Sequence, residues 1–346
     1  MSKPVLSAHF ESRVPSDVRL SQMKYAERKN KPEAVINVGI GNVSLPTNPA
    51  MQKRMFNLDA PESPFNKGVI RYTATGGFGE TQDAFINILK CQGFDTSKLS
   101  VVVTDGGSTG MELLIIGVCG PAGADEKPLM MIDPAYTNYI SFAERLGRKT
   151  ITVKRHLNED GKFSLPEIDK IEETIKESNP GALLVVPYDN PTGQYFDKET
   201  LISLAELCVK YNMWMASDEA YRELFYIEGN ELVSIWGITD DDVPGIEGRR
   251  ISIETASKVW NACGLRIGAV ITDNPEFGKR CTAEYTANLC ANAIGQYIFG
   301  ALAHESKEQI ADWCKDLRNY YGGMIKNVTS EFKKLEPGLI ISSPDA

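Results

Sequence analysis

The chain has 346 residues, of which 42% are hydrophobic and 24% charged, a composition typical of a globular protein of about two domains. Its formal net charge is −9 and it has no basic block, which argues against nucleic acid and anionic membranes as partners. No apolar run has the length of a membrane span, and the N-terminus lacks the apolar stretch of a signal peptide. A cytoplasmic protein is expected.

The seven cysteines have no CxxC spacing, and the three histidines are not spaced like metal ligands. This distribution is typical of reduced, buried thiols in a cytosolic protein. We therefore expect neither a disulfide framework nor a metal site, and Ser-His-Asp hydrolysis is a poor hypothesis.

The N-terminal part of the chain gives few signals. Residues 1 to about 30 are polar and mixed, as in an arm or a helix that lies on another surface. A short strand is predicted over Val35–Val38, before a turn that contains Gly39 and Gly41. Such glycines serve either a simple turn or the close approach of the backbone to a ligand. The later segment Gly77–Gly79 does not complete GxGxxG, so a dinucleotide loop is rejected.

The first regular unit is an apolar strand, Leu99–Val103, followed by a small-residue loop over residues 104–110 and an apolar helix, Met111–Cys119. Such a loop aims backbone N–H groups and the helix dipole at an anion, usually a phosphate. Many α/β loops that bind nothing have the same pattern.

The next strands end in polar or aromatic residues. The strand Leu129–Ile132 leads to Tyr136, which would either stack on a planar ring or pack half-buried. After a strand over Thr150–Val153, the apolar run Ala182–Pro187 predicts a strand buried on both faces. Asn190 follows it, as part of a good turn sequence and also as a rigidly held hydrogen-bond donor.

The predicted strand Met213–Ala216 is followed by the carboxylate of Asp218 and then by Tyr221. A buried carboxylate is costly without a partner. Asp218 therefore either has a cationic or protonated partner or is a solvated acid. Residues 229–248 are predicted to form a largely polar surface insertion.

A strand over Arg250–Ile253 ends just before Lys258, and another follows over Ala269–Ile271. The carboxyl ends of parallel strands are where doubly wound α/β proteins place their chemistry. A lysine there can be desolvated and form a Schiff base. Taken alone, Ser-x-Lys is also typical of a surface lysine that begins a loop.

Beyond Pro275 the pattern is helical to about Lys334, and residues 335–346 begin a strand. The alternation of strands and helices predicts an α/β fold, in which a large domain has a mostly parallel mixed sheet flanked by helices. The N- and C-terminal segments are expected to form a smaller α+β domain.

In this order, the strand-end motifs resemble the class I/II aminotransferases, which are fold-type I pyridoxal-phosphate enzymes of the aspartate aminotransferase-like superfamily. The motifs that carry the resemblance are Gly107-Ser108-Thr109, Asp133-Pro134-Ala135-Tyr136, Asn190-Pro191-Thr192-Gly193, Asp218-Glu219-Ala220-Tyr221, and Thr255-Ala256-Ser257-Lys258 with Arg266. The resemblance implies pyridoxal 5'-phosphate as cofactor. It also implies transfer of an amino group from an amino acid to a 2-oxo acid through a Lys258 Schiff base.

The resemblance gives each site residue an expected role. Lys258 would carry the cofactor and shuttle a proton, and Asp218 would keep the pyridine nitrogen protonated so that the ring acts as an electron sink. Tyr136 would stack on the ring, while Asn190 and Tyr221 would hydrogen-bond its phenolic oxygen. The expected phosphate ligands are Ser108, Thr109, Thr255, Ser257 and Arg266.

Tyr72 matches a tyrosine that, in this family, reaches the phosphate of the neighbouring subunit, which implies a homodimer with shared active sites. Ile40 and Gly41, with Asn190, match segments that contact the substrate. The expected domains are an arm with part of the small domain over 1–48, a large cofactor-binding domain over 49–295, and connecting helices with the start of the small domain over 296–346.

The family's second substrate arginine, which clamps the α-carboxylate, would lie in a C-terminal segment beyond Ala346. The small domain is therefore expected to be incomplete in this sequence. A protein that ends at Ala346 is expected to form the Schiff base but to transaminate poorly.

Three alternatives remain. A carbon–sulfur β-lyase shares the fold, the cofactor and the early steps, and differs by releasing pyruvate and ammonia. A non-catalytic relative, such as the effector domain of a transcription regulator, is disfavoured by the acidic charge and by the lack of a DNA-binding segment before residue 30. An ordinary nucleotide binder would leave Lys258 and Asp218 unexplained.

Overall fold

A computed structural model describes residues 4–32, 35–36, 41–227, 229, 231–336, 338 and 344–346. The chain divides into two compact units, Met1–Ser44 and Leu45–Ala346. The first unit contains helices α1 (Ala8–Glu11) and α2 (Asp17–Ala26). Val35 and Ile36 are not in a strand, so that prediction is wrong for these residues, and the rest of the predicted strand lies outside the described residues. The proposed strand at the C-terminal end also falls mostly outside them.

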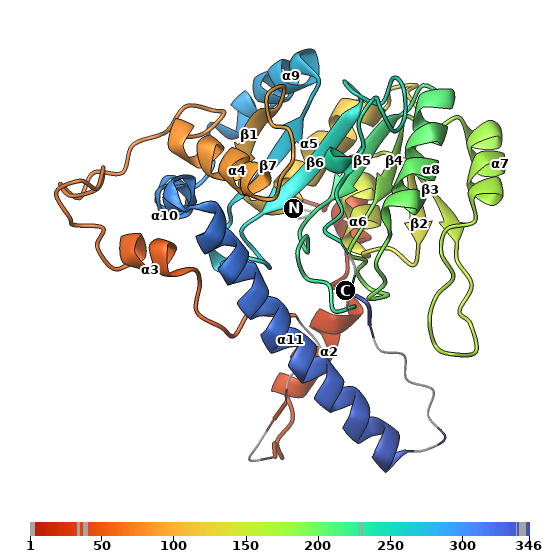
Figure 1. Ribbon diagram of the computed structural model, residues 1–346, viewed down its shortest axis with the longest axis horizontal. Coiled ribbons are helices and arrows are strands. Elements are labelled where there is room, and N and C mark those ends of the chain that lie inside the picture. The colour runs from red at the N-terminus through yellow and green to blue at the C-terminus, as the bar shows by residue number, and fades with distance from the viewer. Residues whose placement is uncertain are drawn as a thin grey trace. The chain divides into compact units, whose positions relative to one another are not determined.

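A seven-stranded sheet forms the centre of the second unit, in the order β1-β7-β6-β5-β4-β2-β3 (Figure 1). Strand β7 runs antiparallel to β1 and β6, and the other pairs are parallel. This mostly parallel mixed sheet confirms the predicted fold class. The strands are β1 (Ser100–Thr104), β2 (Leu129–Asp133), β3 (Thr150–Lys154), β4 (Ala182–Val185), β5 (Trp214–Asp218), β6 (Arg250–Thr255) and β7 (Gly268–Thr272).

Helices cover both faces of this sheet (Figure 1). Successive strand residues point to opposite faces, so Met215 enters one hydrophobic core and Ala216 the other. The first core contains residues of α4 (Gly79–Cys91), α7 (Ile168–Ser178), α8 (Lys198–Lys210) and α10 (Ala293–Gly300). The second core contains residues of α5 (Gly106–Cys119), α6 (Asn138–Arg145) and α9 (Pro275–Tyr285).

Two further helices of the second unit also contribute residues to the first core. Helix α3 (Pro49–Met55) packs against α10, and the long helix α11 (Lys307–Leu335) contacts α4. The short 3₁₀ helices are η1 (Ile235–Gly237), η2 (Cys263–Leu265), η3 (Thr286–Asn288) and η4 (Ala301–His304). Among the helices of the described residues, none is both long enough and apolar enough to cross a membrane.

Two predictions about local structure are wrong. Helix α5 begins at Gly106 and not at Met111, so most of the predicted loop forms its first turn, where backbone amides need no partner within the helix. The stretch 231–248, predicted to be a polar surface insertion, buries Ile235, Trp236 and Ile246. Its few apolar side chains are enough to cover the sheet, while its many carboxylates keep the sequence polar on average.

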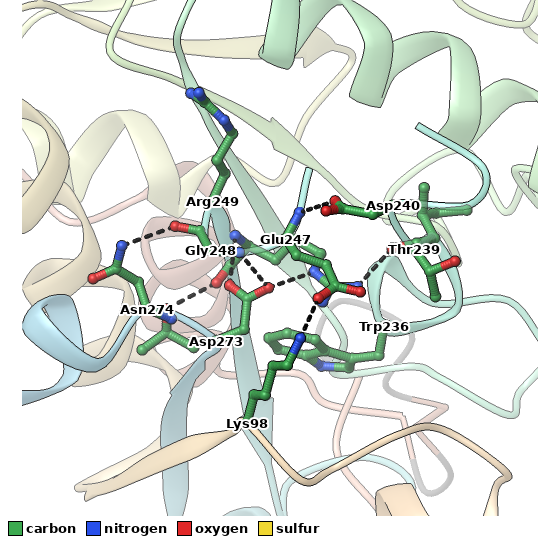
Figure 2. Close-up of polar contacts among 12 residues, drawn as sticks. Lys98, Trp236, Thr239, Asp240, Glu247, Gly248, Arg249, Asp273 and Asn274 are labelled. Carbon is green, nitrogen blue, oxygen red and sulfur yellow. Dashed lines mark hydrogen bonds and ion pairs between the residues drawn. The ribbon is translucent and has the colours of Figure 1, made fainter. Parts of the chain in front are cut away.

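Buried charges hold this stretch to the sheet. The Asp273 carboxylate, just after β7, accepts a hydrogen bond from the Gly248 amide at 2.8 Å (Figure 2). It also accepts from the Arg250 amide at 3.1 Å and from the Arg250 Nε at 2.8 Å. Nearby, Lys98 Nζ lies 2.7 Å from a carboxylate oxygen of Glu247 (Figure 2). The Arg250–Asp273 pair is almost fully buried, so each charge depends on the other.

We predict that Asp273→Ala lowers the free energy of unfolding by about 3–5 kcal/mol, because it leaves the Arg250 guanidinium buried without its carboxylate. Urea unfolding followed by circular dichroism measures this. The matched control is Glu276→Ala, which breaks the exposed Arg280–Glu276 pair and should cost less than about 0.5 kcal/mol. Equal unfolding midpoints for the two variants would contradict this account of the fold.

Candidate active site at the carboxyl ends of the strands

The N-terminus of α5 is open toward the edge of the sheet. Asp105 precedes the helix, but within the described structure its side chain does not cap the first turn. Its carboxylate instead accepts hydrogen bonds from the Tyr285 hydroxyl at 3.1 Å and the Asn292 amide at 3.0 Å. The first-turn amides of α5 therefore have no side-chain carboxylate opposite them, which is the arrangement that binds an anion.

Arg266 lies at this same helix end. Its guanidinium approaches Gly106 so closely that a Cβ on Gly106 would collide with it, and Gly106 has a φ of +80° that favours glycine. Thr255, at the end of β6, is a close neighbour of Gly107. The Thr255 hydroxyl also donates to the Ser257 hydroxyl at 2.8 Å. A guanidinium, two hydroxyls and helix amides thus gather at one point.

The other predicted phosphate ligands belong to the same turn. Ser108 is exposed and Thr109 is half-buried in the first turn of α5. The Thr109 hydroxyl is 3.4 Å from the Asp105 carbonyl oxygen. Both residues therefore lie at the helix end that faces Arg266, although their roles stay predictions.

Asp218 ends β5, and its carboxylate is held by neutral donors. The Tyr139 hydroxyl donates to it at 2.6 Å and the Ala220 amide at 3.0 Å. Burial raises the pKa of the Asp218 carboxyl, while these two hydrogen bonds act in the opposite direction. Tyr139, on α6, was missed in the sequence, although it lies only three residues after Tyr136.

Tyr221 lies near both Asp218 and Lys258. The Lys258 Nζ lies 5.9 Å from the centroid of the Tyr221 ring. Burial, with smaller contributions from the charge of Asp218 and from Tyr136, raises the pKa of Tyr221 to about 12. Tyr221 is therefore a neutral phenol that can donate a hydrogen bond at physiological pH.

Tyr136 lies close enough to both Asp218 and Arg266 for their charges to affect it. Its ring packs edge-on against Tyr139, with centroids 5.4 Å apart. Burial raises the pKa of Tyr136; the charge of Asp218 raises it further, and the charge of Arg266 lowers it. The residue is 38% exposed, so part of it is accessible to a ligand.

A buried ion pair joins the loops that carry Tyr136 and Asn190. Arg155, directly after β3, pairs with Asp189, and their side chains are only 1% and 5% exposed. Arg155 also donates to the Pro134 carbonyl at 3.2 Å. The pair thereby ties the loop after β2 to the loop after β4. This pair was not predicted, because its only local signal is an arginine next to a strand.

The proposed roles of Tyr72, Gly41 and Ile40 stay predictions. Tyr72 is 79% exposed. Gly41 belongs to the N-terminal unit, and Ile40 lies outside the described residues. Asn190 is half-buried in the turn after β4, beside the pair that holds its loop. The described residues contain no group of three or more His, Cys, Asp or Glu side chains placed to hold a metal ion.

We predict that Asp218→Asn stabilises the cofactor-free protein at neutral pH. Because burial raises the Asp218 pKa in the folded state, the ionised carboxylate destabilises the fold above its unfolded-state pKa, and the cost disappears as the pH falls below it. The unfolding free energy, measured in urea from pH 4 to pH 8, should exceed the wild type by an amount that grows with pH. A variant that is less stable than the wild type at pH 8 would contradict this.

Comparison with known proteins places the chain in a family. A family model described as aminotransferase class I and II matches residues 33–346. An aspartate aminotransferase of Sulfurisphaera tokodaii is 28% identical over 288 residues, which are 82% of this chain and 66% of that protein. A probable aspartate aminotransferase of Methanocaldococcus jannaschii is 26% identical over 320 residues, or 90% of this chain and 78% of that protein. The chain thus spans about two thirds of the length of the Sulfurisphaera relative.

Solved structures share the fold. The aspartate aminotransferase of Thermus thermophilus with maleate has a TM-score of 0.80 at 19% identity, covering 99% of this chain and 83% of that chain. The pyridoxal-phosphate-bound C–S lyase of Staphylococcus hominis has a TM-score of 0.74 at 18% identity, covering 89% of this chain and 72% of that chain. With the family model matching nearly the whole sequence, the chain belongs to the class I and II aminotransferases.

Proposed function

We propose that the protein is a pyridoxal-phosphate-dependent aminotransferase that moves an amino group from an amino acid to a 2-oxo acid. The observation that carries the proposal is the position of Arg266 against the open first turn of α5, in the same strand-edge region as Asp218, Tyr221 and Lys258. A phosphate at one end and a ring nitrogen at the other are the two features of this cofactor that those groups would recognise.

The anion end of the site fits a phosphate. The uncapped amides of α5, the Arg266 guanidinium and the hydroxyls of Thr255 and Ser257 are donors, and none is an acidic side chain. A Cβ on Gly106 would fill the space that the guanidinium needs. Charge-assisted hydrogen bonds from a guanidinium and helix amides are the strong way to hold such a group.

The opposite end fits a protonated ring nitrogen. Burial disfavours the ionised form of Asp218, and a cation beside it would restore that form. When bound, the cofactor supplies an electron sink for the charge that is left when an amino acid loses its α-proton. Asp218 would keep the ring nitrogen protonated, and Tyr136 would cover one face of the ring.

Lys258 and Tyr221 would act at the reacting end. The Lys258 amine would hold the cofactor covalently, and once released it would carry a proton to and from the α-carbon of the substrate. Tyr221, a neutral phenol because its pKa is raised to about 12, would donate a hydrogen bond together with Asn190. Ile40, Gly41 and Asn190 are the proposed substrate contacts.

A second copy of the chain is proposed to complete the site. Tyr72 is 79% exposed, and its neighbours Val69 and Ile70 are also exposed, at 50% and 62%. Such a run of exposed apolar side chains favours contact with another surface. We propose that it meets a second subunit, where Tyr72 would reach the phosphate. The free cysteines of the described residues support a cytoplasmic location.

A carbon–sulfur β-lyase is the second candidate. It is favoured by the fold similarity to the Staphylococcus hominis C–S lyase. The two reactions differ in products, so release of pyruvate and ammonia from a cysteine conjugate separates a lyase from a transaminase.

The proposal predicts a covalent adduct at Lys258. Addition of pyridoxal phosphate should give a visible absorbance band, and borohydride should then fix the cofactor to the Lys258 peptide, which mass spectrometry detects. Lys258→Ala should lose both the adduct and at least about 10³-fold in activity. The control Lys279→Ala removes an exposed lysine and should behave as the wild type. A wild-type protein without adduct would refute the enzyme proposal.

The proposal also predicts that Gly106→Ala weakens phosphate binding by about tenfold or more, because the added Cβ collides with the Arg266 guanidinium and strains a positive φ. Titration calorimetry of the cofactor-free protein with inorganic phosphate measures this. Gly107→Ala is the control, since its Cβ would meet Ile253 at an ordinary 3.4 Å. The phosphate site is misplaced if both variants bind phosphate like the wild type.

A further inference from the structure

A buried cluster of charges lies behind Asp218. Arg222 donates to both carboxylate oxygens of Glu254, from Nη1 at 2.7 Å and from Nη2 at 2.8 Å. Glu219 approaches the same guanidinium at 3.5 Å. The three side chains are 4%, 6% and 0% exposed in the order Arg222, Glu254, Glu219. Two carboxylates therefore share one guanidinium away from water.

Strand geometry places this cluster on the other face of the sheet from Asp218. In the β5–β6 pair, Asp218 is opposite Ile253, and neighbouring residues point to opposite faces. Glu219 and Glu254 therefore point away from the face that carries Asp218 and Thr255. They directly follow Asp218 and directly precede Thr255, so the cluster joins the ends of the two strands that lead to the site.

The two carboxylates differ in their partners. Glu219 accepts hydrogen bonds from the hydroxyls of Ser217 at 3.0 Å and Ser234 at 2.8 Å, and from the Ile235 amide at 3.3 Å. Glu254 has the bidentate contact with Arg222 and one hydroxyl, that of Ser252 at 3.0 Å. The charge of Glu254 thus depends chiefly on Arg222 for its neutralisation.

The orientation of Arg222 is also fixed. Its Nε donates to Gln92 at the end of α4, at 2.9 Å, and the Gln92 amide donates to Glu223 at 3.0 Å. A guanidinium held from both sides has one available position, and that position is against Glu254. Such a pair is expected to leave a weaker field in its surroundings than an unpaired buried charge would.

Few charged groups face Asp218. Its carboxylate is contacted by Tyr139 from α6, while Tyr136 and Tyr221 lie nearby as neutral phenols. Glu254, on β6, is the carboxylate whose charge raises the pKa of Asp218, after the larger effect of burial. A change in the pairing of the Glu254 charge should therefore change the pKa of Asp218.

We propose that Arg222 is a positioning residue that acts through Glu254, and that this pair sets the charge on Asp218 and so its readiness to hold a cation. The proposal rests on the proposed function only in naming Asp218 as the residue that holds the ring nitrogen. Arg222 and Glu254 touch neither substrate nor cofactor in it.

The test measures Asp218 itself in the cofactor-free protein. Carbon-13 NMR of protein labelled at the aspartate carboxyl carbons gives the titration curve, and Asp218→Asn identifies the resonance. Arg222→Gln leaves Glu254 unneutralised and should raise the Asp218 pKa by about one unit. Glu254→Gln removes that charge and leaves Arg222 with Glu219 as its remaining carboxylate, so it should lower the Asp218 pKa. The double variant Arg222→Gln/Glu254→Gln should return close to the wild type.

The opposite signs separate charge control from simple loss of structure. Both single variants break the same buried pair, so a merely structural role predicts the same direction of change, or none, for both. That result would overturn the proposal. Arg222→Lys keeps the positive charge and should leave the titration near that of the wild type. If Arg222→Gln does not fold, Glu254→Gln and the double variant still decide: equal titration curves for these two would also overturn it.

The protein with bound pyridoxal phosphate allows a second, independent measurement. If the proposed function holds, Arg222→Gln should move the pH dependence of the cofactor absorbance in the same direction as the Asp218 titration, and Glu254→Gln in the other. If no cofactor binds, the proposed function fails, but the titrations of the cofactor-free protein still test the role of Arg222.

Discussion

The parallel pairing of β5 with β6 is the constraint on which the site depends. With Asp218 opposite Ile253, and the Glu219 amide donating to the Ile253 carbonyl at 3.0 Å, the two strands end at the same edge. Asp218 and the segment from Thr255 to Lys258 must then emerge side by side. A slip of the register by one residue would send each side chain to the other face of the sheet.

The antiparallel strand β7 completes this edge from the opposite direction. It begins at Gly268, where a Cβ would lie 2.6 Å from the Gly107 nitrogen, so glycine is needed for the strand to pass the first turn of α5. Arg266 enters just before it, in the left-handed region at a φ of 54°. The helix end and the guanidinium are thus brought together by backbone packing and not by a direct bond between their side chains.

The carboxylates on the two faces of the sheet have different partners. On the face of the site, Asp105 is turned away from the amides of α5 by Tyr285 and Asn292, and Asp218 is held by neutral donors. Behind it, Glu254 is matched by Arg222. Carboxylates on the face of the site are therefore held by neutral donors, whereas the carboxylate on the opposite face is paired with a guanidinium.

The sequence predicted the strands well, because continuous apolar runs such as Ala182–Val185 leave few alternatives. It also predicted the residues that follow them, since a polar residue after a buried strand is a local signal. It did not predict the start of α5, because the glycines of the first turn are typical of a loop. It missed Tyr139, Arg155 and the Arg222–Glu254 pair, whose partners come from distant segments and are joined only by the folded chain.

One site is proposed to hold the phosphate at the end of α5 and the ring nitrogen at Asp218. A crystal structure of the protein grown with pyridoxal phosphate would test this placement. Phosphate oxygens are expected within hydrogen-bond distance of the first-turn amides of α5 and of Arg266, with the ring nitrogen beside the Asp218 carboxylate. A phosphate bound elsewhere, or a ring nitrogen away from Asp218, would contradict it.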